Sequence, residues 1–243
     1  MTISNNDLKK YSSLNRKIKR KELQLFVVEG EKICKELLKN DFEFESIFTT
    51  EDLQSEFPLS TVCSKKEIAR ISHLKSPSNV VAICKIPTYK INSKDKKPLI
   101  FLDNVNDPGN LGTIVRTLDW FGYKQLFCSK NTVDCFNNKS VMASMGSIFR
   151  VDCHYIDFDE FQQLFPQHVT YGTYLDGENI GSVKLKTNSI IVIGNESNGV
   201  SKEIVDKLNN TIRIPGDGKA ESLNVSVATG IILNELRKIN PQK

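Results

Sequence analysis

An apolar run leads directly into a polar loop with two glycines in the stretch Ile190-Ile191-Val192-Ile193-Gly194-Asn195-Glu196-Ser197-Asn198-Gly199-Val200-Ser201. A short, continuous apolar run of this kind is typical of a strand in a parallel sheet that is covered on both faces. Open parallel sheets bind their ligands at the carboxyl ends of their strands. The stretch therefore predicts an α/β domain with a candidate site directly after residue 193.

The chain on either side continues this alternation of strands and helices. Between residues 99 and 239, strands are expected at 99–102, 126–128, 168–174, 189–194 and 211–214, and helices at 111–121, 139–146, 200–208 and 224–239. A second, smaller alternation has strands expected at 23–28, 46–49 and 80–84, and helices at 29–40 and 65–72. Residues 87–98 between the two are polar, proline-bounded and unpatterned, as in a linker. We therefore predict two domains, residues 1–92 and 93–243.

Length and composition narrow the class of protein. The 243 residues, 39% hydrophobic and 26% charged, fit one large or two small globular domains. No apolar run approaches the 18 residues or more of a membrane-spanning helix, and the amino terminus lacks the apolar stretch of a secretory signal. The six cysteines contain no C-x-x-C pair, and the three histidines lie far apart. We expect a cytoplasmic protein without a metal site or a disulfide framework.

Positive charge gathers at the amino terminus. Residues 1–21 carry seven basic residues against one acidic residue, a net charge of +6, whereas the whole chain carries only +4. Such a cluster suits contact with a polyanion, although a solvated surface explains it equally well. We expect Lys17, Lys19 and Arg20 to contact RNA phosphates.

Two further polar stretches follow expected strands. The first runs from Asp103 to Arg116 and opens into a helix, for which Asn110 is the expected N-cap. Pattern alone leaves Arg116 either a surface salt bridge or a group for catalysis or anion binding. The second, residues 212–226, contains a Gly-Lys pair, but Ala220 follows it where a P-loop has Ser or Thr. The first strand-helix turn also lacks the G-x-G-x-x-G fingerprint, so neither a nucleoside triphosphatase nor a nicotinamide enzyme is favoured.

Taken in order, the three stretches resemble the motifs of the SPOUT superfamily of methyltransferases, in its SpoU/TrmH branch of RNA ribose 2′-O-methyltransferases. The resemblance covers residues 98–240, with motifs at 110–116, at 194–196, and at 214–215 with 222–228. Residues 26–30, Phe-Val-Val-Glu-Gly before a helix, are similar to the L30e-like substrate domain of many members. The resemblance implies a SPOUT α/β-knot domain, with a parallel sheet and a carboxy-terminal trefoil knot, preceded by a small L30e-like α/β domain. It also implies a homodimer.

The resemblance further implies roles for individual residues. The cofactor would be S-adenosylmethionine, held through the backbones of Gly194, Ile214 and Leu223, with Thr173 a further contact. Arg116 would act on the ribose hydroxyl, either as the base or as a stabiliser of the developing alkoxide, which suits an arginine better because neutral guanidine is scarce at pH 7. The residues expected to arrange the loops and the substrate are Asn110, Glu196, Ser222 and Asn224. Gly216 stands where many members have Met.

The function implied is methylation of a ribose 2′-hydroxyl in RNA. Ribosomal RNA of the 23S type is preferred, because the extra amino-terminal domain resembles those of members that act on ribosomal RNA. Two alternatives remain: a transfer RNA 2′-O-methyltransferase, and a noncatalytic RNA-binding or ribosome-assembly protein of the same fold. A housekeeping role and a role in antibiotic resistance are both compatible with the family.

Overall fold

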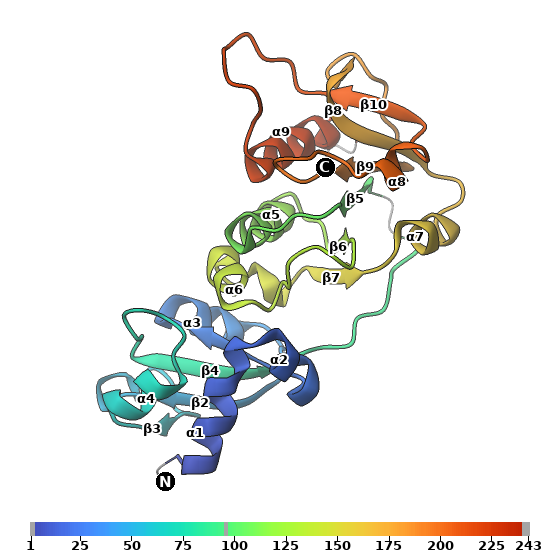
Figure 1. The fold of residues 1–243 in the computed structure, drawn as a ribbon. Helices are drawn as coiled ribbons and strands as arrows, with labels where there is room; N and C mark the ends of the chain where they lie inside the picture. Colours follow the sequence, from blue (N-terminus) through green and yellow to red (C-terminus); the bar gives the residue numbers. More distant parts are fainter. Residues whose placement is uncertain (1–2, 95–96, 240–243) are drawn as a thin grey trace. The chain divides into compact units, whose positions relative to one another are not determined.

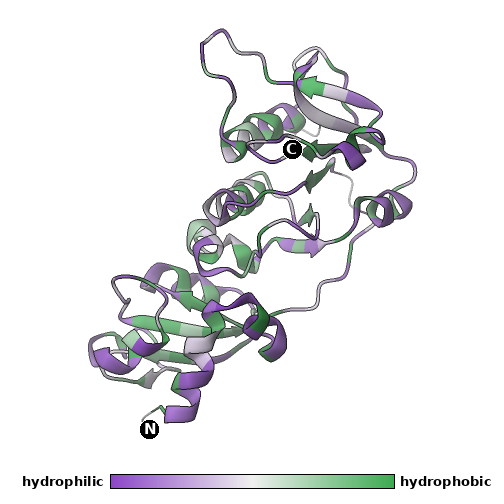
Figure 2. Ribbon diagram, in the orientation of Figure 1, coloured by the Kyte–Doolittle hydropathy of each residue, from purple (hydrophilic) through white to green (hydrophobic). Residues whose placement is uncertain are grey.

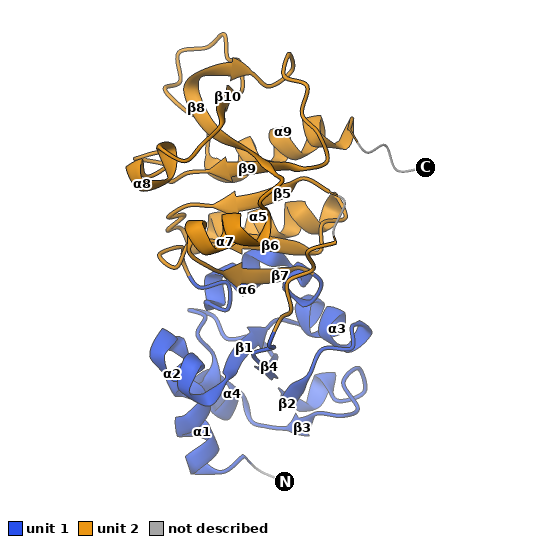
Figure 3. Cartoon of the chain, turned by 90° about the vertical axis from the view of Figure 1, so that its right-hand side faces the viewer, with its two compact units in different colours: residues 1–88, 134–150 blue, residues 89–133, 151–243 orange. Residues whose placement is uncertain are grey.

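A computed structural model describes residues 3–94 and 97–239, which divide into two compact units (Figure 1, Figure 3). Unit 1 comprises residues 1–88 and 134–150, and unit 2 comprises residues 89–133 and 151–243. The boundary between residues 92 and 93 stays a prediction from sequence. Among the helices that the structure describes, none is both long enough and apolar enough to cross a bilayer.

Unit 1 is built on a four-stranded sheet in the order β1-β4-β2-β3. Its strands are β1 (Leu25–Glu29), β2 (Phe44–Thr49), β3 (Thr61–Val62) and β4 (Val80–Lys85). β4 runs antiparallel to β1 and β2, whereas the short β3, which was not expected, runs parallel to β2. β1 begins two residues later than expected, because Leu23 ends a helix and Gln24 turns the chain with a left-handed φ of 54°.

Short helices pack around this sheet. They are α1 (Asn5–Ser12), α2 (Lys17–Leu23), α3 (Glu31–Lys39), α4 (Lys65–Ile71) and α6 (Asn138–Ser144), with 3-10 turns at Ser13–Asn15, Glu51–Leu53 and Ser147–Phe149. α4 begins with a capping box, in which Ser64 and Glu67 each bond the other's backbone N–H. α1 and α2 occupy a stretch for which only a basic patch was expected. Leu8 and Tyr11 of α1 are buried in one core with Ile68 of α4, so the basic stretch is part of the folded unit.

Residues 134–150 belong to unit 1, although strands of unit 2 precede and follow them in the chain (Figure 3). The ring of Phe136 lies 4.6 Å from that of Phe26 in β1. The ring of Phe149 lies 5.0 Å from that of Phe42, and α6 contacts β1. This segment therefore completes the apolar core of unit 1.

Unit 2 contains a six-stranded sheet in the order β10-β8-β9-β5-β6-β7, and all neighbouring strands are parallel. The strands are β5 (Leu99–Leu102), β6 (Gln125–Cys128), β7 (Asp152–Tyr155), β8 (Val169–Asn179), β9 (Ser189–Ile193) and β10 (Asn210–Arg213). β5 and β9 are buried throughout and appear in hydrophobic green in Figure 2. The expected α/β class with a parallel sheet is confirmed, and the knot stays a prediction. β7 was missed because Asp152 and His154 interrupt its apolar pattern.

Helices cover both faces of this sheet. They are α5 (Pro108–Trp120), α7 (Phe158–Leu164), α8 (Lys202–Val205) and α9 (Val225–Arg237). Figure 1 shows α5 and α9 on one side and α7 and α8 on the other. Phe161 of α7 and Ile204 of α8 join a core cluster with Phe101 and Phe127 of the sheet. α7 was not expected, and α8 is a single turn where a helix over 200–208 was expected.

The described residues of the expected linker, 87–94 and 97–98, form neither helix nor strand. Part of the segment is nevertheless bound to unit 2. The Gln125 side chain accepts a hydrogen bond from Asn92 N at 3.0 Å and donates one to Asn92 O at 2.9 Å. Ile91 packs against the core of unit 2. Ile91 and Asn92 are therefore part of the folded unit 2.

Candidate active site

Three polar loops leave the same edge of the sheet of unit 2. They follow β5, β9 and β10, whose carboxyl ends lie at one edge because the strands are parallel. β5 and β9 are direct neighbours, and β8 separates β9 from β10. The structure thus brings the three unusual stretches of the sequence to the edge at which open α/β sheets bind ligands.

The first loop enters α5 through Asp107 and Pro108. Asp107, not Asn110, is the N-cap, because its Oδ1 accepts a hydrogen bond from Asn110 N at 2.8 Å. Pro108 occupies the first turn, where a missing N–H costs nothing. The expectation that Asn110 caps the helix was therefore wrong. Asn110 lies inside the first turn of α5, and its side chain is free to bond elsewhere.

Asn110 links all three loops through its side-chain amide. Its Nδ2 donates a hydrogen bond to Oε1 of Glu196 at 2.6 Å, and its Oδ1 accepts one from Nδ2 of Asn224 at 3.0 Å. Asn224 is also the N-cap of α9, since its Oδ1 accepts a hydrogen bond from Ser226 N at 2.9 Å. A residue from each of the three loops therefore takes part in one hydrogen-bonded chain, Asn224 to Asn110 to Glu196.

The second loop leaves no room for a side chain at position 194. A Cβ atom on Gly194 would lie 2.1 Å from the carbonyl carbon of Gly199 and 2.2 Å from Val200 N. Asn195 and Gly199 exchange two backbone hydrogen bonds of 2.9 Å, which fold the loop back on itself. Gly199 closes this turn with a φ of 66°. Glycine is required here by close backbone approach and by a left-handed turn.

The residues expected to hold a cofactor lie within β8, directly after β9 and β10, and just before α9. Thr173 is half-buried in a bulge of β8, because pairing with β10 passes directly from Gly172 to Glu178. Ile214 is half-buried immediately after β10. Leu223 lies next to the N-cap of α9 and leaves 47% of its surface exposed. These residues share the edge on which the chain of asparagine and glutamate side chains lies.

Arg116 and Ser222 are both exposed. Arg116 lies six residues beyond Asn110 on α5, about 9 Å further along the helix axis. Within the described part of the chain its guanidinium has neither a hydrogen bond nor an ion pair, so its charge is available to a ligand. Ser222 likewise makes no side-chain hydrogen bond to a described residue.

The three basic residues expected to contact RNA lie on α2 of unit 1, in different surroundings. Lys17 is exposed and has no ion-pair partner among the described residues. Lys19 pairs with Glu22 at 2.6 Å on the surface. Arg20 is buried, with Nη2 2.6 Å from Oδ2 of Asp134 and Nη1 donating to the carbonyl of Leu14 at 2.8 Å. The guanidinium of Arg20 therefore donates its hydrogen bonds to groups inside unit 1.

Two asparagines of the site, Asn195 and Asn104, were not among the individual residues predicted for it. Asn195 donates a hydrogen bond from Nδ2 to the carbonyl oxygen of Asn104 at 2.8 Å, and so joins the loop after β9 to the loop after β5. Asn104 has a left-handed φ of 55°. The available signal was an asparagine two residues after each of the buried strands β5 and β9, because asparagine tolerates the left-handed conformation and bonds backbone groups.

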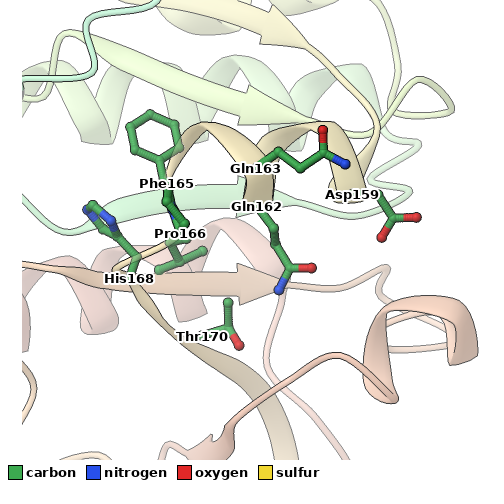
Figure 4. Close-up of a pocket in the computed structure, with 8 residues that line it drawn as sticks. Asp159, Gln162, Gln163, Phe165, Pro166, His168 and Thr170 are labelled. Atoms are coloured by element: carbon green, nitrogen blue, oxygen red, sulfur yellow. The ribbon is translucent and has the colours of Figure 1, made fainter.

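A pocket of unit 2 lies at the opposite edge of the sheet (Figure 4). It has a volume of about 560 Å³ and lies between α7 and the first residues of β8 and β9, near Phe165, His168 and Thr170. Burial lowers the pKa of His168 below its ordinary value. No residue predicted for the site lines this pocket. The six cysteines are buried thiols, and no cluster of metal-ligating side chains occurs among residues 3–94 and 97–239.

Fold and site together define a two-unit α/β protein in which three loops bond to one another at the carboxyl edge of a parallel sheet. The chain belongs to the SpoU rRNA Methylase family, whose sequence pattern matches residues 97–234. Residues 5–82 match the pattern of the MRM3-like substrate binding domain. The expected membership in the SpoU/TrmH methyltransferases is confirmed.

Several named relatives are similar to this chain. A Bacillus subtilis protein named 23S rRNA (guanosine(2553)-2'-O)-methyltransferase RlmP is 29% identical over 96% of both chains. An Aquifex aeolicus protein named tRNA (guanosine(18)-2'-O)-methyltransferase is 34% identical over 63% of this chain and 74% of its own. Among solved structures, an AdoMet-bound rRNA methyltransferase from Sinorhizobium meliloti is 27% identical, with a TM-score of 0.86 over 100% of this chain and 99% of its own. A TrmH-family protein from Porphyromonas gingivalis is 31% identical, with a TM-score of 0.85 over 97% and 98%.

Proposed function

We propose that this protein transfers a methyl group from S-adenosylmethionine to a ribose 2′-hydroxyl of ribosomal RNA of the 23S type. The observation that carries the proposal is the hydrogen-bonded chain of Asn224, Asn110 and Glu196, which unites the three family motifs at one edge. Similarity to the B. subtilis 23S rRNA enzyme over 96% of both chains supports the choice of substrate. The tRNA enzyme of A. aeolicus matches only 63% of this chain, which disfavours transfer RNA. Because its proposed substrate is ribosomal RNA, the protein is proposed to act in the cytoplasm.

The carboxyl edge fits S-adenosylmethionine in two respects. The tight turn at Gly194 packs the main chain of the second loop against itself, so this part of the edge offers main-chain groups and no side chain at position 194. Ile214 and Leu223, both at least partly exposed, hold the adenosyl part through their backbones in this proposal, and the half-buried Thr173 is a further contact. When bound, the cofactor supplies an electrophilic methyl group on its sulfonium. The chain's part is to align the 2′-oxygen with that methyl group.

In this proposal Arg116 is the residue that acts on the ribose hydroxyl. A guanidinium stays protonated at pH 7, so its main contribution is to stabilise the negative charge that develops on the 2′-oxygen as the hydroxyl proton passes to solvent water. Its lack of partners among the described residues leaves all its donors to the substrate. Asn110, Glu196 and Asn224 fix the loops around the reacting atoms, and Ser222 lies exposed beside Asn224 to contact the substrate.

The proposed RNA surface of unit 1 is the exposed side of α2. Lys17 and Lys19 contact phosphates there, because Lys17 is unpaired within the described residues and the surface pair of Lys19 with Glu22 exchanges readily. Arg20 is buried beneath this surface and stabilises it through its ion pair with Asp134. Reversing charge at Lys17 and Lys19 should weaken RNA binding and flatten its dependence on salt. Unchanged affinity and salt slope would remove α2 from the RNA surface.

We further propose a homodimer formed through α5 and α9. Val227 and Ile231, one turn apart on α9, are 51% and 36% exposed, and Leu223 precedes them. Trp120 at the end of α5 is 85% exposed, and α5 packs against α9. Exposed apolar side chains on two helices that pack together mark an interaction surface. Light scattering should give twice the 27.5 kDa of one chain, and Ile231→Asp should lower this mass.

The proposed function is tested with S-adenosylmethionine labelled in its methyl group and two unmodified transcripts, 23S rRNA and a tRNA pool. We expect label at the 2′-oxygen of one nucleotide of the ribosomal RNA, together with calorimetric binding of the cofactor. Label in tRNA alone would replace the substrate. Binding of RNA without any transfer would make the protein the noncatalytic RNA-binding alternative.

A further inference from the structure

We propose that Asn195 is a positioning residue for methyl transfer, which holds the carboxylate of Glu196 against Asn110. The inference rests on the proposed function and deepens it. Asn195 touches neither of the groups expected to react, and it acts through the loop that it organises.

The first part of the argument is the local turn. The Oδ1 atom of Asn195 accepts hydrogen bonds from Ser197 N at 2.9 Å and Asn198 N at 3.3 Å. Its backbone exchanges two further bonds of 2.9 Å with Gly199. This asparagine therefore fixes the backbone on both sides of Glu196, the residue that lies between it and Ser197. The Glu196 carboxylate leaves a backbone whose direction is already set.

The second part is the bond that leaves the turn. Nδ2 of Asn195 donates to the carbonyl oxygen of Asn104 at 2.8 Å, across the gap between the ends of β9 and β5. α5, which carries Asn110, begins a few residues after Asn104. One side chain thereby ties the strand end that precedes Glu196 to the strand end that precedes Asn110.

The third part is that Asn104 is itself held. Its left-handed backbone is fixed by a hydrogen bond from Asn104 N to Oγ of Ser129 at 2.9 Å, in the loop after β6. Oγ of Ser129 lies 3.1 Å from Oγ1 of Thr132, which donates to the carbonyl of Leu102 at 3.3 Å. The support for Asn195 thus runs sideways across three neighbouring strands, β9, β5 and β6.

These bonds place the two ends of the hydrogen bond between Glu196 and Asn110 on a common support. This hydrogen bond is 2.6 Å long and joins residues 86 apart in the chain. It forms only when both loops hold their positions relative to each other. Without Asn195 the two loops stay joined by the bond from Ser201 N to Oδ2 of Asp103 at 2.7 Å, but the turn that carries Glu196 loses its own bond to the loop after β5. Small displacements of groups that orient a reaction reduce its rate far more than they reduce binding.

The test compares two asparagines at opposite ends of one strand. Asn195 follows β9 and donates to the carbonyl of Asn104 at 2.8 Å, whereas Asn188 precedes β9 and donates to the carbonyl of Gln167 at 2.7 Å. Asn195→Ala and Asn188→Ala thus each remove one amide bond to a backbone oxygen. We expect kcat to fall about 10- to 100-fold in Asn195→Ala, with KM for RNA within about twofold, and both parameters to stay near wild type in Asn188→Ala.

Asn195→Asp distinguishes the role of the side-chain acceptor, Oδ1, from that of the side-chain donor, Nδ2. It keeps the oxygen that accepts from Ser197 and Asn198 but places an acceptor against the carbonyl of Asn104, so it should lose as much kcat as Asn195→Ala. The double variant Asn195→Ala with Glu196→Gln should cost no more than the worse single variant, because both act on one interaction. Wild-type kcat in Asn195→Asp, equal losses in Asn195→Ala and Asn188→Ala, or additive losses in the double variant would each overturn the proposal.

A readout without turnover separates this inference from the proposed function. The side-chain amide signals of Asn110 in ¹⁵N–¹H spectra report its bond to Glu196 directly. They should shift in Asn195→Ala and stay in place in Asn188→Ala. Unshifted Asn110 signals in Asn195→Ala would overturn the positioning role even for an active enzyme. A wild-type protein that transfers no methyl group, but whose Asn110 signals respond as expected, would instead contradict the proposed function alone.

Discussion

Asn110 and Asn224, 114 residues apart in the chain, are joined by a hydrogen bond of 3.0 Å, and Asn110 also donates to Glu196 at 2.6 Å. Asn110→Ala removes both bonds at once. We expect the rate of methyl transfer to fall about 100-fold, because the loops lose their common orientation. All three side chains are at least partly exposed, so the free energy of unfolding should change by about 1 kcal/mol or less. Single-turnover rates and urea unfolding check the two effects, and a large loss of stability would make Asn110 a structural residue instead.

Arg116→Ala tests the charge proposed to stabilise the 2′-oxygen. Removal of one preorganised donor to a developing oxyanion costs about 10²- to 10³-fold in rate. The affinity for S-adenosylmethionine should stay near wild type, as measured by calorimetry. Lys124→Ala, an exposed cation just before β6 at the other edge of the sheet, is the control and should leave the rate unchanged. Full turnover by Arg116→Ala would refute the assignment.

Arg20 and its neighbour Lys19 should differ sharply in stability when truncated. The side chains of Arg20 and Asp134 are only 4% and 14% exposed, and Arg20→Ala leaves a nearly buried carboxylate without its partner. The free energy of unfolding should fall by about 3 to 5 kcal/mol. Lys19→Ala removes a surface pair and should cost about 1 kcal/mol or less. Urea titration of both variants decides, and equal losses would contradict the buried position of Arg20.

Gly194→Ala should disturb the cofactor site by steric conflict alone. The added methyl group would lie 2.1 Å from the carbonyl carbon of Gly199, so the second loop must move. We expect binding of S-adenosylmethionine to weaken by about 1.4 kcal/mol or more, which is about tenfold. In Gly181→Ala the methyl group meets its nearest neighbour, Oδ1 of Asn179, at an ordinary 3.4 Å. Calorimetry should find wild-type affinity in that control, and tight binding by Gly194→Ala would place the cofactor elsewhere.

Stability should depend on pH through Glu29, a fully buried carboxyl of β1. Burial raises its pKa above the ordinary value, although the Ser72 hydroxyl and His73 N donate to it and oppose this shift. A carboxyl with a raised folded pKa binds more protons folded than unfolded, so stability falls as pH rises through the interval between the two values. Relative to wild type, Glu29→Gln should therefore gain unfolding free energy as pH rises above about 4.3.

The contribution of Glu67 to stability, in the same unit, depends on pH with the opposite sign to that of Glu29. The hydrogen bond from the Ser64 hydroxyl lowers the pKa of Glu67, so its contribution to stability is present above the unfolded pKa and is lost as pH falls through the folded pKa. Glu67→Gln should therefore lose unfolding free energy relative to wild type as pH rises. Urea titrations at several pH values measure both differences. If the unfolding free energies of the two variants, relative to wild type, changed with pH in the same direction, burial would not control the pKa of Glu29.

The sequence predicted the parts of the fold that depend on local pattern. β5 and β9 are continuous apolar runs, and the position of the polar loops after them at one edge follows from strand direction alone. The capping of α5 was assigned to the wrong residue, because Asp107 and Asn110 are both good caps and only the helix start distinguishes them. α7 was missed because its polar residues hide the two phenylalanines that enter the core.

Long-range partners could not be read from the sequence. Arg20 stands among basic residues and resembles an RNA contact, yet its partner Asp134 lies 114 residues away. The support of Asn195 by Asn104 likewise spans 91 residues and depends on β9 and β5 being neighbours in the sheet. Such contacts follow from strand order, which the pattern of apolar residues does not specify. The candidate residues were therefore predictable as a set, and their mutual bonds were not.

Residues 134–150 complete unit 1, although they are made after the first strands of unit 2. During synthesis, the aromatic partners of Phe26 and Phe42 emerge from the ribosome more than 100 residues after them. We expect the amino-terminal unit to wait for that stretch before its core closes. A single crossover between two genes could not exchange either unit whole, since each is assembled from two separate pieces of the chain. One such event therefore cannot give this protein a new, intact copy of one unit and leave the other unchanged.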